Sequence, residues 1–544
     1  MSNDGFAPPS DGGAGWSGTG GWAGSEPERL AGPGGPGGPT SHSRRSPRGT
    51  KVAALVAVLV VLIGGGAFAF YRVDPLHLFR AGPQAAEAVP SDAIAYVGVD
   101  LDPSAQQKIA ALRFLTRFPG FTKATKLTDA NSDIRKSIAN EILGDCPGLS
   151  YAADVEPWLG SKLGMAVLPG RGRGAGSPSP FALLQVTDQA AAQRSLGKLT
   201  SCLAGRGGTA AAHAFVDGYL VLGATSAQTQ RYVADLRQGS LAASTTFQAD
   251  MAALGTPGVA SAWADLSALT RLTHQPDLNP ALALNSSYRR AAATLRFGSG
   301  DVQLVTAAYG GSATSQVVAN PVVHLPASTM AALSVSGGEK YLDSEWPALA
   351  KRLKGQGVDL GQTAAMLRAE TGLSLPSDLA TLLGQNLLVA VDRSGATAAT
   401  LRSGNFQRLS IGARFTNDPG SLDRVYAKIV GLFQQSGGRL PLVKRDFPDG
   451  ISVASNAGYA ESLGRLQGDL GDSADFKSVV DNGASQQFVL YVDFATIRAQ
   501  VLAALQDSGA PPNAVDNLRP LRALGVTGSR HGQYLVTTVT VSAN

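Results

Sequence analysis

The feature that most constrains the fold of this chain is a long internal repeat. Seven sequence blocks recur in the same order, each pair separated by 224 to 236 residues. The pairs are Pro90–Val99 with Pro326–Val335, Leu159–Val167 with Leu383–Val391, Phe181–Asp188 with Leu409–Asp418, Asp217–Gly223 with Asp449–Ser455, Phe247 with Phe476, Ala262–Leu269 with Leu490–Ile497, and Gln303–Thr306 with Tyr534–Thr537. The period is far longer than the roughly 20–50 residues of a solenoid, so each copy is expected to be a domain or half-domain with its own core.

We therefore place copy one at residues 88–319 and copy two at residues 322–544. The alternative is that Ala/Val/Leu-rich strands resemble one another without a duplication. Apolar runs bounded by Gly, Pro or Asp predict strands in copy one. These runs are Ile94–Val99, Leu163–Leu168, Ala182–Val186, Tyr219–Leu222, Ala260–Ala264 and Val302–Ala308.

Amphipathic helices are expected between the strands, after Asp188 in copy one and after Asp418-Pro419 in copy two. The Gly298–Asp301 segment reads as the turn of an antiparallel hairpin. This mixture predicts an α+β fold: two tandem related copies with largely antiparallel sheets, preceded by one transmembrane helix and a disordered tail.

The transmembrane prediction rests on Val52–Phe70, a run of 19 residues without a charge. As a helix it would be about 28 Å long, close to the hydrocarbon thickness of a bilayer. The basic flank of Arg44, Arg45, Arg48 and Lys51 orients a helix at 51–71 with its N-terminus in the cytoplasm. We expect a single-pass protein of the cell membrane, with most of the chain extracytoplasmic. A cleaved signal peptide and a buried core helix are the alternatives.

The segments on either side of this run differ in composition. Residues 1–50 are rich in Gly and Pro and are expected to form a disordered cytoplasmic tail, and residues 72–87 a tether. Only 16% of the chain is charged and the formal net charge is +5, with the basic cluster beside the apolar run. We therefore expect the lipid bilayer as a partner, and not nucleic acid.

Two cysteines are too few for a disulfide scaffold. Cys146 and Cys202 both fall in copy one, on the predicted oxidising side of the membrane. A bridge between them would close a loop of about 57 residues and stabilise the fold by roughly 4 kcal/mol. The alternative is two buried thiols.

The candidate catalytic residues are aspartates. Asp100 ends a predicted strand, and Asp265 and Asp493 occupy equivalent places in the repeat. Carboxylates can act as general acids and bases, but at strand ends they more often cap turns and helices. The chain has no Gly-x-Ser-x-Gly, His-Glu-x-x-His, Cys-x-x-Cys or Walker motif, so we expect no cofactor and no metal.

The block Val89–Pro103, followed by Lys108–Phe118 and preceded by the tail and the apolar run, resembles a known family. This is a family of uncharacterised actinobacterial single-pass membrane proteins, defined only by a domain of unknown function. The resemblance covers about residues 88–544. It implies a membrane-anchored envelope protein and supplies no catalytic residues.

Three hypotheses for function follow. The first is a non-enzymatic binding or scaffold role in the cell envelope, with a ligand, lipid or partner protein held between the two copies. The second is a hydrolase or transferase that acts on envelope material through carboxylates near Asp100, Asp265 or Asp493. The third is a structural anchor whose tail recruits a cytoplasmic partner.

Overall fold

The computed structural model describes the folded part of the chain. The described residues are 83–125, 135–136, 148–170, 178–205, 212–272, 287–311, 318–355, 357–395, 408–435, 442–507 and 512–544. The predicted tail, the apolar run and residues 72–82 of the tether lie outside these ranges. In the described part of the chain, no helix has the length and apolar character needed to cross a membrane.

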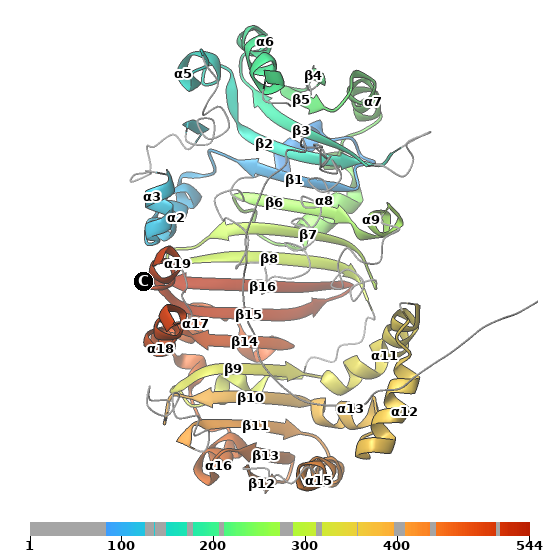
Figure 1. Ribbon diagram of the computed structural model, residues 1–544, viewed down its shortest axis with the longest axis vertical. Coiled ribbons are helices and arrows are strands. Elements are labelled where there is room, and N and C mark those ends of the chain that lie inside the picture. The colour runs from blue at the N-terminus through green and yellow to red at the C-terminus, as the bar shows by residue number, and fades with distance from the viewer. Residues whose placement is uncertain are drawn as a thin grey trace, which may run out of the picture. The chain divides into compact units, whose positions relative to one another are not determined.

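The described strands form one antiparallel sheet of 16 strands (Figure 1). Across the sheet their order is β12-β13-β11-β10-β9-β14-β15-β16-β8-β7-β6-β1-β2-β3-β5-β4. We call β1 to β8 the first half and β9 to β16 the second half. Read outward from the centre, the order in the first half is 8-7-6-1-2-3-5-4, and the order in the second half is the same sequence with eight added.

The first half contains eight strands and several helices. Its strands are β1 (Ala95–Asp100), β2 (Leu159–Leu168), β3 (Ser179–Val186), β4 (Ala212–Val216), β5 (Tyr219–Gly223), β6 (Ala260–Asp265), β7 (Tyr288–Phe297) and β8 (Asp301–Gly310). Its helices are η3 (Pro83–Ala88), α2 (Ala105–Leu115), α3 (Pro119–Thr125), α5 (Tyr151–Asp154), α6 (Gln189–Gly205), α7 (Ser226–Leu236), η5 (Leu241–Ala243), α8 (Thr245–Ala252) and α9 (Leu266–Leu272).

The second half repeats this arrangement, with longer helices after its first strand. Its strands are β9 (Thr329–Ser336), β10 (Asn386–Asp392), β11 (Ser410–Thr416), β12 (Val443–Phe447), β13 (Gly450–Ala454), β14 (Phe488–Asp493), β15 (Leu521–His531) and β16 (Tyr534–Ala543). Its helices are η7 (Pro321–His324), α11 (Gly338–Gly355), α12 (Leu360–Thr371), α13 (Ser377–Leu383), α15 (Pro419–Gln435), α16 (Ala457–Arg465), η9 (Leu470–Asp472), α17 (Ala474–Lys477), η10 (Gly483–Ser485), α18 (Phe494–Asp507) and α19 (Pro512–Leu518).

The two halves meet at a seam between β8 and β16, in the middle of the sheet in Figure 1. The pairing is antiparallel and runs from Tyr534 opposite Tyr309 to Ser542 opposite Asp301. The seam is a continuous ladder of backbone hydrogen bonds. It satisfies donors and acceptors that each strand would otherwise expose at an edge.

The predicted fold class is therefore wrong. We expected two tandem copies with their own sheets behind a transmembrane helix, whereas one sheet runs through both halves and no described helix could span a membrane. The physical reason is the edge strand: a separate sheet in each copy would leave β8 or β16 with unpaired backbone groups, and joining the two removes both edges. The copy boundaries at 319 and 322 fall between β8 and β9 and remain a prediction.

Local predictions from periodicity agree with the structure more closely. All six strands predicted in copy one are present, and the hairpin at Gly298–Asp301 joins β7 to β8. Asp188 and Asp418 accept hydrogen bonds from the N–H groups of Ala191 and Ser421 and so cap α6 and α15. Helix α2 is capped by Ser104, and Asp102 just before it pairs with Lys108.

The largest cores lie against one face of the sheet, which we call the covered face. In the first half, buried side chains of η3, α7, η5 and α8 pack on it, including Tyr232 and Phe247. In the second half η7, α16, η9 and α17 do the same, with Leu463 and Phe476. The covered face is thus shielded by helices in both halves.

Candidate functional site

The opposite face of the sheet carries an apolar surface that crosses the seam. Directly paired residues of antiparallel strands point to the same face, so the strand registers define a row of neighbouring side chains. The row on β10, β9, β14, β15, β16, β8 and β7 is Val389, Leu333, Leu490, Val526, Val539, Leu304 and Leu295. We call these seven residues the central apolar face. At a strand spacing of about 4.8 Å the row is about 29 Å long.

The central apolar face is less buried than the covered face. Val526 and Val539 beside the seam are 8% and 6% exposed, and the other five side chains are only partly buried. The corresponding row on the covered face is Leu388, Ser334, Val489, Thr527, Thr538, Val305 and Thr294. Six of those seven are buried, with Leu388, Ser334 and Val489 at 0% exposure.

The chemistry of the two rows is the reverse of what burial predicts. In an antiparallel sheet with one solvated face, the buried face is normally apolar and the exposed face polar. Here the covered row contains one serine and three threonines, whereas the more exposed row is entirely Val and Leu. Two side chains of this row are buried and five are partly buried, so it is a partly covered apolar surface. Apolar surface that the described helices leave in contact with solvent is typical of a binding surface.

Among the described residues, several helices pack around the margins of this face, and those at the strand ends also contact Leu295 and Leu304 of the row. Helix α6 packs near Leu163 and Leu184 toward one edge of the sheet, and α15 packs near Phe415 and Val453 toward the other. At the strand ends, α2 packs on Phe297 and Val541, and α9 packs on Ala264 and Ala291. Figure 1 shows these helices around the strands that carry the central apolar face.

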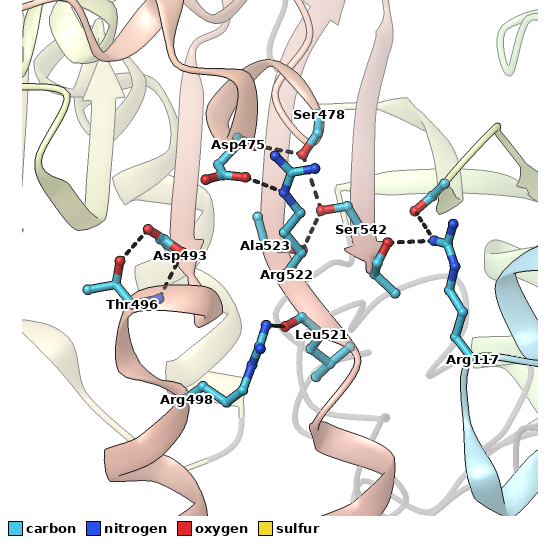
Figure 2. A network of polar contacts seen from close by, with 12 residues as sticks. Arg117, Asp475, Ser478, Asp493, Thr496, Arg498, Leu521, Arg522, Ala523 and Ser542 are labelled. Atoms are coloured by element: carbon cyan, nitrogen blue, oxygen red, sulfur yellow. Dashed lines mark hydrogen bonds and ion pairs between the residues drawn. The ribbon is translucent and has the colours of Figure 1, made fainter.

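Arginines lie at both ends of the strands next to the seam. At one end, Arg117 donates to the backbone oxygens of Gly300 and Ala543, at 3.3 and 2.5 Å, and Arg498 donates to that of Leu521 at 3.0 Å (Figure 2). At the other end, Arg530 donates to the Gly310 oxygen at 3.0 Å and to the Tyr288 hydroxyl at 3.3 Å. Burial raises the pKa of Tyr288 to about 12, with smaller contributions from Tyr341, Arg530 and Glu345.

A buried ion pair of the first half, Asp250 with Arg290, is linked to the second half by a hydrogen bond on the covered face. Asp250 of α8 accepts hydrogen bonds from Trp263 Nε1 at 2.8 Å and Arg290 Nε at 2.7 Å. It also accepts one at 2.8 Å from the hydroxyl of Tyr534, which belongs to β16 of the second half. The Arg290 guanidinium lies 4.0 Å from the centre of the Tyr309 ring. This network is fully partnered, so it stabilises the junction and leaves no lone pair aimed at a ligand.

Burial is the largest single influence on the pKa values of Arg290 and Tyr534, and Asp250 is the next largest. Burial lowers the pKa of Arg290, but the hydrogen bonds and charge of Asp250 outweigh this effect and the pKa is raised. Burial raises the pKa of Tyr534 to about 12, and Asp250 adds to the shift. Both groups therefore keep their ordinary neutral-pH protonation.

The three candidate aspartates occupy turn and cap positions, far apart on the sheet. Asp100 accepts a hydrogen bond from the N–H of Asp102 at 2.9 Å. Asp265 caps α9 through the N–H of Ala268 at 2.9 Å, and Asp493 caps α18 through the N–H and hydroxyl of Thr496 (Figure 2). The structure does not bring them together: they end three different strands, β1, β6 and β14. Their geometry is that of ordinary structural caps.

The other sequence candidates are not tested. Cys146 lies outside the described residues, and the side chain of Cys202 is likewise not described, so the disulfide stays a prediction. Within the described ranges, no group of three or more His, Cys, Asp and Glu side chains is placed to hold a metal ion.

Sequence reasoning missed the central apolar face. The available signal was strands that are apolar on both faces, such as Phe488-Val-Leu-Tyr-Val492, where alternation with polar residues is absent. Such runs indicate a strand covered on both sides. They do not reveal which side the described helices leave partly exposed, because that depends on where distant helices pack.

Comparison with known proteins identifies a family without an assigned activity. Residues 52–394 match the family described as "Protein of unknown function (DUF3352)". The match begins before and ends well short of the resemblance expected from the sequence, and it does not address actinobacterial origin or a single-pass topology. The curated proteins include none that matches the chain.

Solved structures offer only weak likenesses. Crystal forms IV and I of TP0453 both have a TM-score of 0.21, at 11% and 12% sequence identity. They cover 41% and 42% of this chain, and 79% and 80% of their own. A TM-score this low carries no argument about fold or function.

Proposed function

Since this chain belongs to the DUF3352 family of proteins of unknown function, the site must supply the argument, and we propose that the protein is a non-enzymatic lipid-binding protein. In this proposal the acyl chain of a lipid lies on the central apolar face. The expected position in the cell envelope, outside the membrane, is part of the same proposal because it places the protein next to lipid.

The observation that carries the proposal is the reversed polarity of the two faces. Leu333, Leu490 and Leu304 remain partly exposed while Ser334 and Thr294 are buried beneath helices. Moving a leucine side chain from water to full burial is worth about 1.5–3 kcal/mol. A ligand with a flexible hydrocarbon chain can cover apolar side chains of several strands at once, and each side chain that it buries contributes to this free energy.

An enzymatic role receives less support from the structure. The carboxylate of each candidate aspartate accepts a hydrogen bond from a backbone N–H in its own turn or helix. General acid–base catalysis needs such a group within hydrogen-bond reach of a substrate proton.

The test is binding of a neutral single-chain lipid, monomyristoylglycerol, to the full-length protein, measured by isothermal titration calorimetry. Leu490→Gln removes an apolar contact from the face and is expected to weaken binding about ten-fold. The matched control is Glu461→Gln, an exposed change on α16, which packs against the covered face. Undetectable binding by the wild type, or equal binding by L490Q and the wild type, would contradict the proposal.

A further inference from the structure

The two outer edges of the sheet are formed by equivalent strands with different chemistry. Strand β4 ends the first half and β12 ends the second, at opposite ends of the sheet in Figure 1. The β4 sequence, Ala-His-Ala-Phe-Val, has no Lys, Arg, Asp or Glu, whereas the β12 sequence is Val-Lys-Arg-Asp-Phe. Charged side chains on an edge strand, Lys above all, discourage pairing with another chain. The β12 edge therefore has this protection and the β4 edge lacks it.

The turn after β4 determines which backbone groups its edge presents. Asp217 and Gly218 connect β4 to β5, and their φ angles of 49° and 75° are typical of a two-residue type I′ turn. In such a hairpin the two residues that flank the turn exchange both backbone hydrogen bonds, so Val216 bonds inward to β5. Inward and outward pairing alternate along a strand. His213 and Phe215 therefore direct their N–H and C=O groups away from β5.

These outward backbone groups form an unpaired edge. His213 is exposed and Phe215 is half-buried. In the described part of the chain, β4 has no neighbouring strand except β5, and no other hydrogen bond reaches the backbone of His213 or Phe215. Such an edge is a template for one more strand, which can satisfy two donors and two acceptors.

The equivalent edge of β12 is occupied by charge. The β12–β13 hairpin also has a two-residue connection, so its outward residues are Lys444 and Asp446. Lys444 is ion-paired with both Asp423 and Asp446. If two copies of β12 paired about a two-fold axis at Arg445, this residue would lie opposite its own copy. Like charges directly opposite one another destabilise a sheet.

The same operation on β4 produces a compatible pairing. With the two-fold axis at Ala214, His213 of one copy lies opposite Phe215 of the other, and their outward groups form four hydrogen bonds. Ala214 then faces Ala214, so no like charges meet. The imidazole and phenyl rings are also suited to contact, because within one chain they already lie edge to face with centroids 6.3 Å apart.

The seam shows that this fold joins related sheets by their edges. Strands β8 and β16 hold equivalent places in the two halves and pair antiparallel there. We propose that β4 pairs in the same way with β4 of a second copy of this chain, which makes the protein a two-fold symmetric dimer. This contact uses the same edge twice, so the dimer is closed and both of its free ends are the charged β12. The inference is independent of lipid binding, which concerns the strands near the seam.

The first test is the oligomeric state of the full-length protein in detergent, measured by sedimentation velocity over a range of concentrations. The wild type should form dimers. His213→Pro removes an outward N–H that β5 does not use, and proline is tolerated at such edge positions. Two hydrogen bonds are lost per dimer, so the dissociation constant should rise at least about ten-fold. The matched control, Lys444→Pro at the equivalent position of β12, should leave the dimer unchanged.

The second test places a cysteine on the two-fold axis. Residues that face each other in a non-hydrogen-bonded pair have Cα atoms about 4.5 Å apart, which is within the range of a disulfide. Mild oxidation of Ala214→Cys should therefore give a covalent dimer, above the level that Cys146 and Cys202 give in the wild type. Arg445→Cys, the equivalent change on β12, should give none. Circular dichroism of each variant confirms that the fold is kept.

Several results would overturn the inference. One is a wild type that stays monomeric, and slow hydrogen exchange at His213 and Phe215 in that monomer would show that another segment of the chain covers the edge. Another is a dimer that His213→Pro leaves intact and Ala214→Cys does not crosslink. Larger assemblies weakened equally by H213P and K444P would also overturn it, because they would show head-to-tail pairing of β4 with β12.

Discussion

Removing the carboxylate of Asp250 should weaken the junction between the two halves of the sheet. Asp250 is fully buried and accepts hydrogen bonds from Trp263, Arg290 and Tyr534. Loss of one partner from a buried ion pair costs about 3–5 kcal/mol, because the remaining charge is left in a poorly solvated site. The Arg290 side chain is 20% exposed, so water can relieve part of this cost. We expect Asp250→Asn to lower the free energy of unfolding by about 3 kcal/mol.

The second half offers a matched control, since Asp475 of α17 pairs with Arg522 of β15. These two side chains are 30% and 37% exposed, and a pair so accessible to solvent contributes only about 0–1 kcal/mol. Urea unfolding of D250N and D475N, followed by circular dichroism, gives both midpoints and slopes. Equal losses in the two variants, or a change in D250N of less than about 0.5 kcal/mol, would refute the reasoning that burial sets the cost.

Three further predictions follow from the same structure. Tyr534→Phe removes a hydrogen bond to a charged group, so the wild type should be more stable by about 1.5–3 kcal/mol. The pKa of Tyr534 is raised from 10.0 to about 12 in the fold. The stability difference between the wild type and Y534F should therefore be constant below pH 10 and be lost between pH 10 and 12, as measured by unfolding at each pH. A stability difference that grows over that range would contradict the prediction. Val489→Gln should lower the free energy of unfolding by more than about 2 kcal/mol and Leu490→Gln by less than about 1 kcal/mol. The reason is that Val489 points to the covered face and Leu490 to the central apolar face. Similar losses in chemical unfolding would show that both faces are equally shielded. Alkylation under non-reducing conditions should find Cys146 and Cys202 blocked in the exported protein, and two modified thiols would exclude the disulfide.

Periodicity and repeats predicted the local structure well and its assembly poorly. Strands such as Ala260–Asp265 and caps such as Asp418 depend on neighbouring residues, so they can be read from the chain. The seam pairs Val305 with Thr538, residues far apart in the sequence, and nothing in either segment specifies that partner. The order of the strands is the same in the two halves, yet the repeat alone did not reveal that both halves share one sheet.

The candidate site was harder to predict for a related reason. The aspartates were visible because carboxylates at strand ends are conspicuous, but their hydrogen bonds show them as caps. Arg117 and Arg498 stand far apart in the chain, and their contacts with Ala543 and Leu521 follow from the tertiary structure. Exposure of Leu304 and Leu490 depends on where helices stop covering the sheet, which is a property of the tertiary structure.

The central claim, that a lipid chain lies on the central apolar face, is tested most directly by photo-crosslinking. A myristoyl lipid with a diazirine on its acyl chain would be activated on the full-length protein, and the labelled residues identified by mass spectrometry. The account predicts labels on strands β9, β14, β16 and β8, at or beside Leu333, Leu490, Val539 and Leu304. Labels confined to the outer surfaces of helices, or on covered-face residues such as Val489, would contradict it.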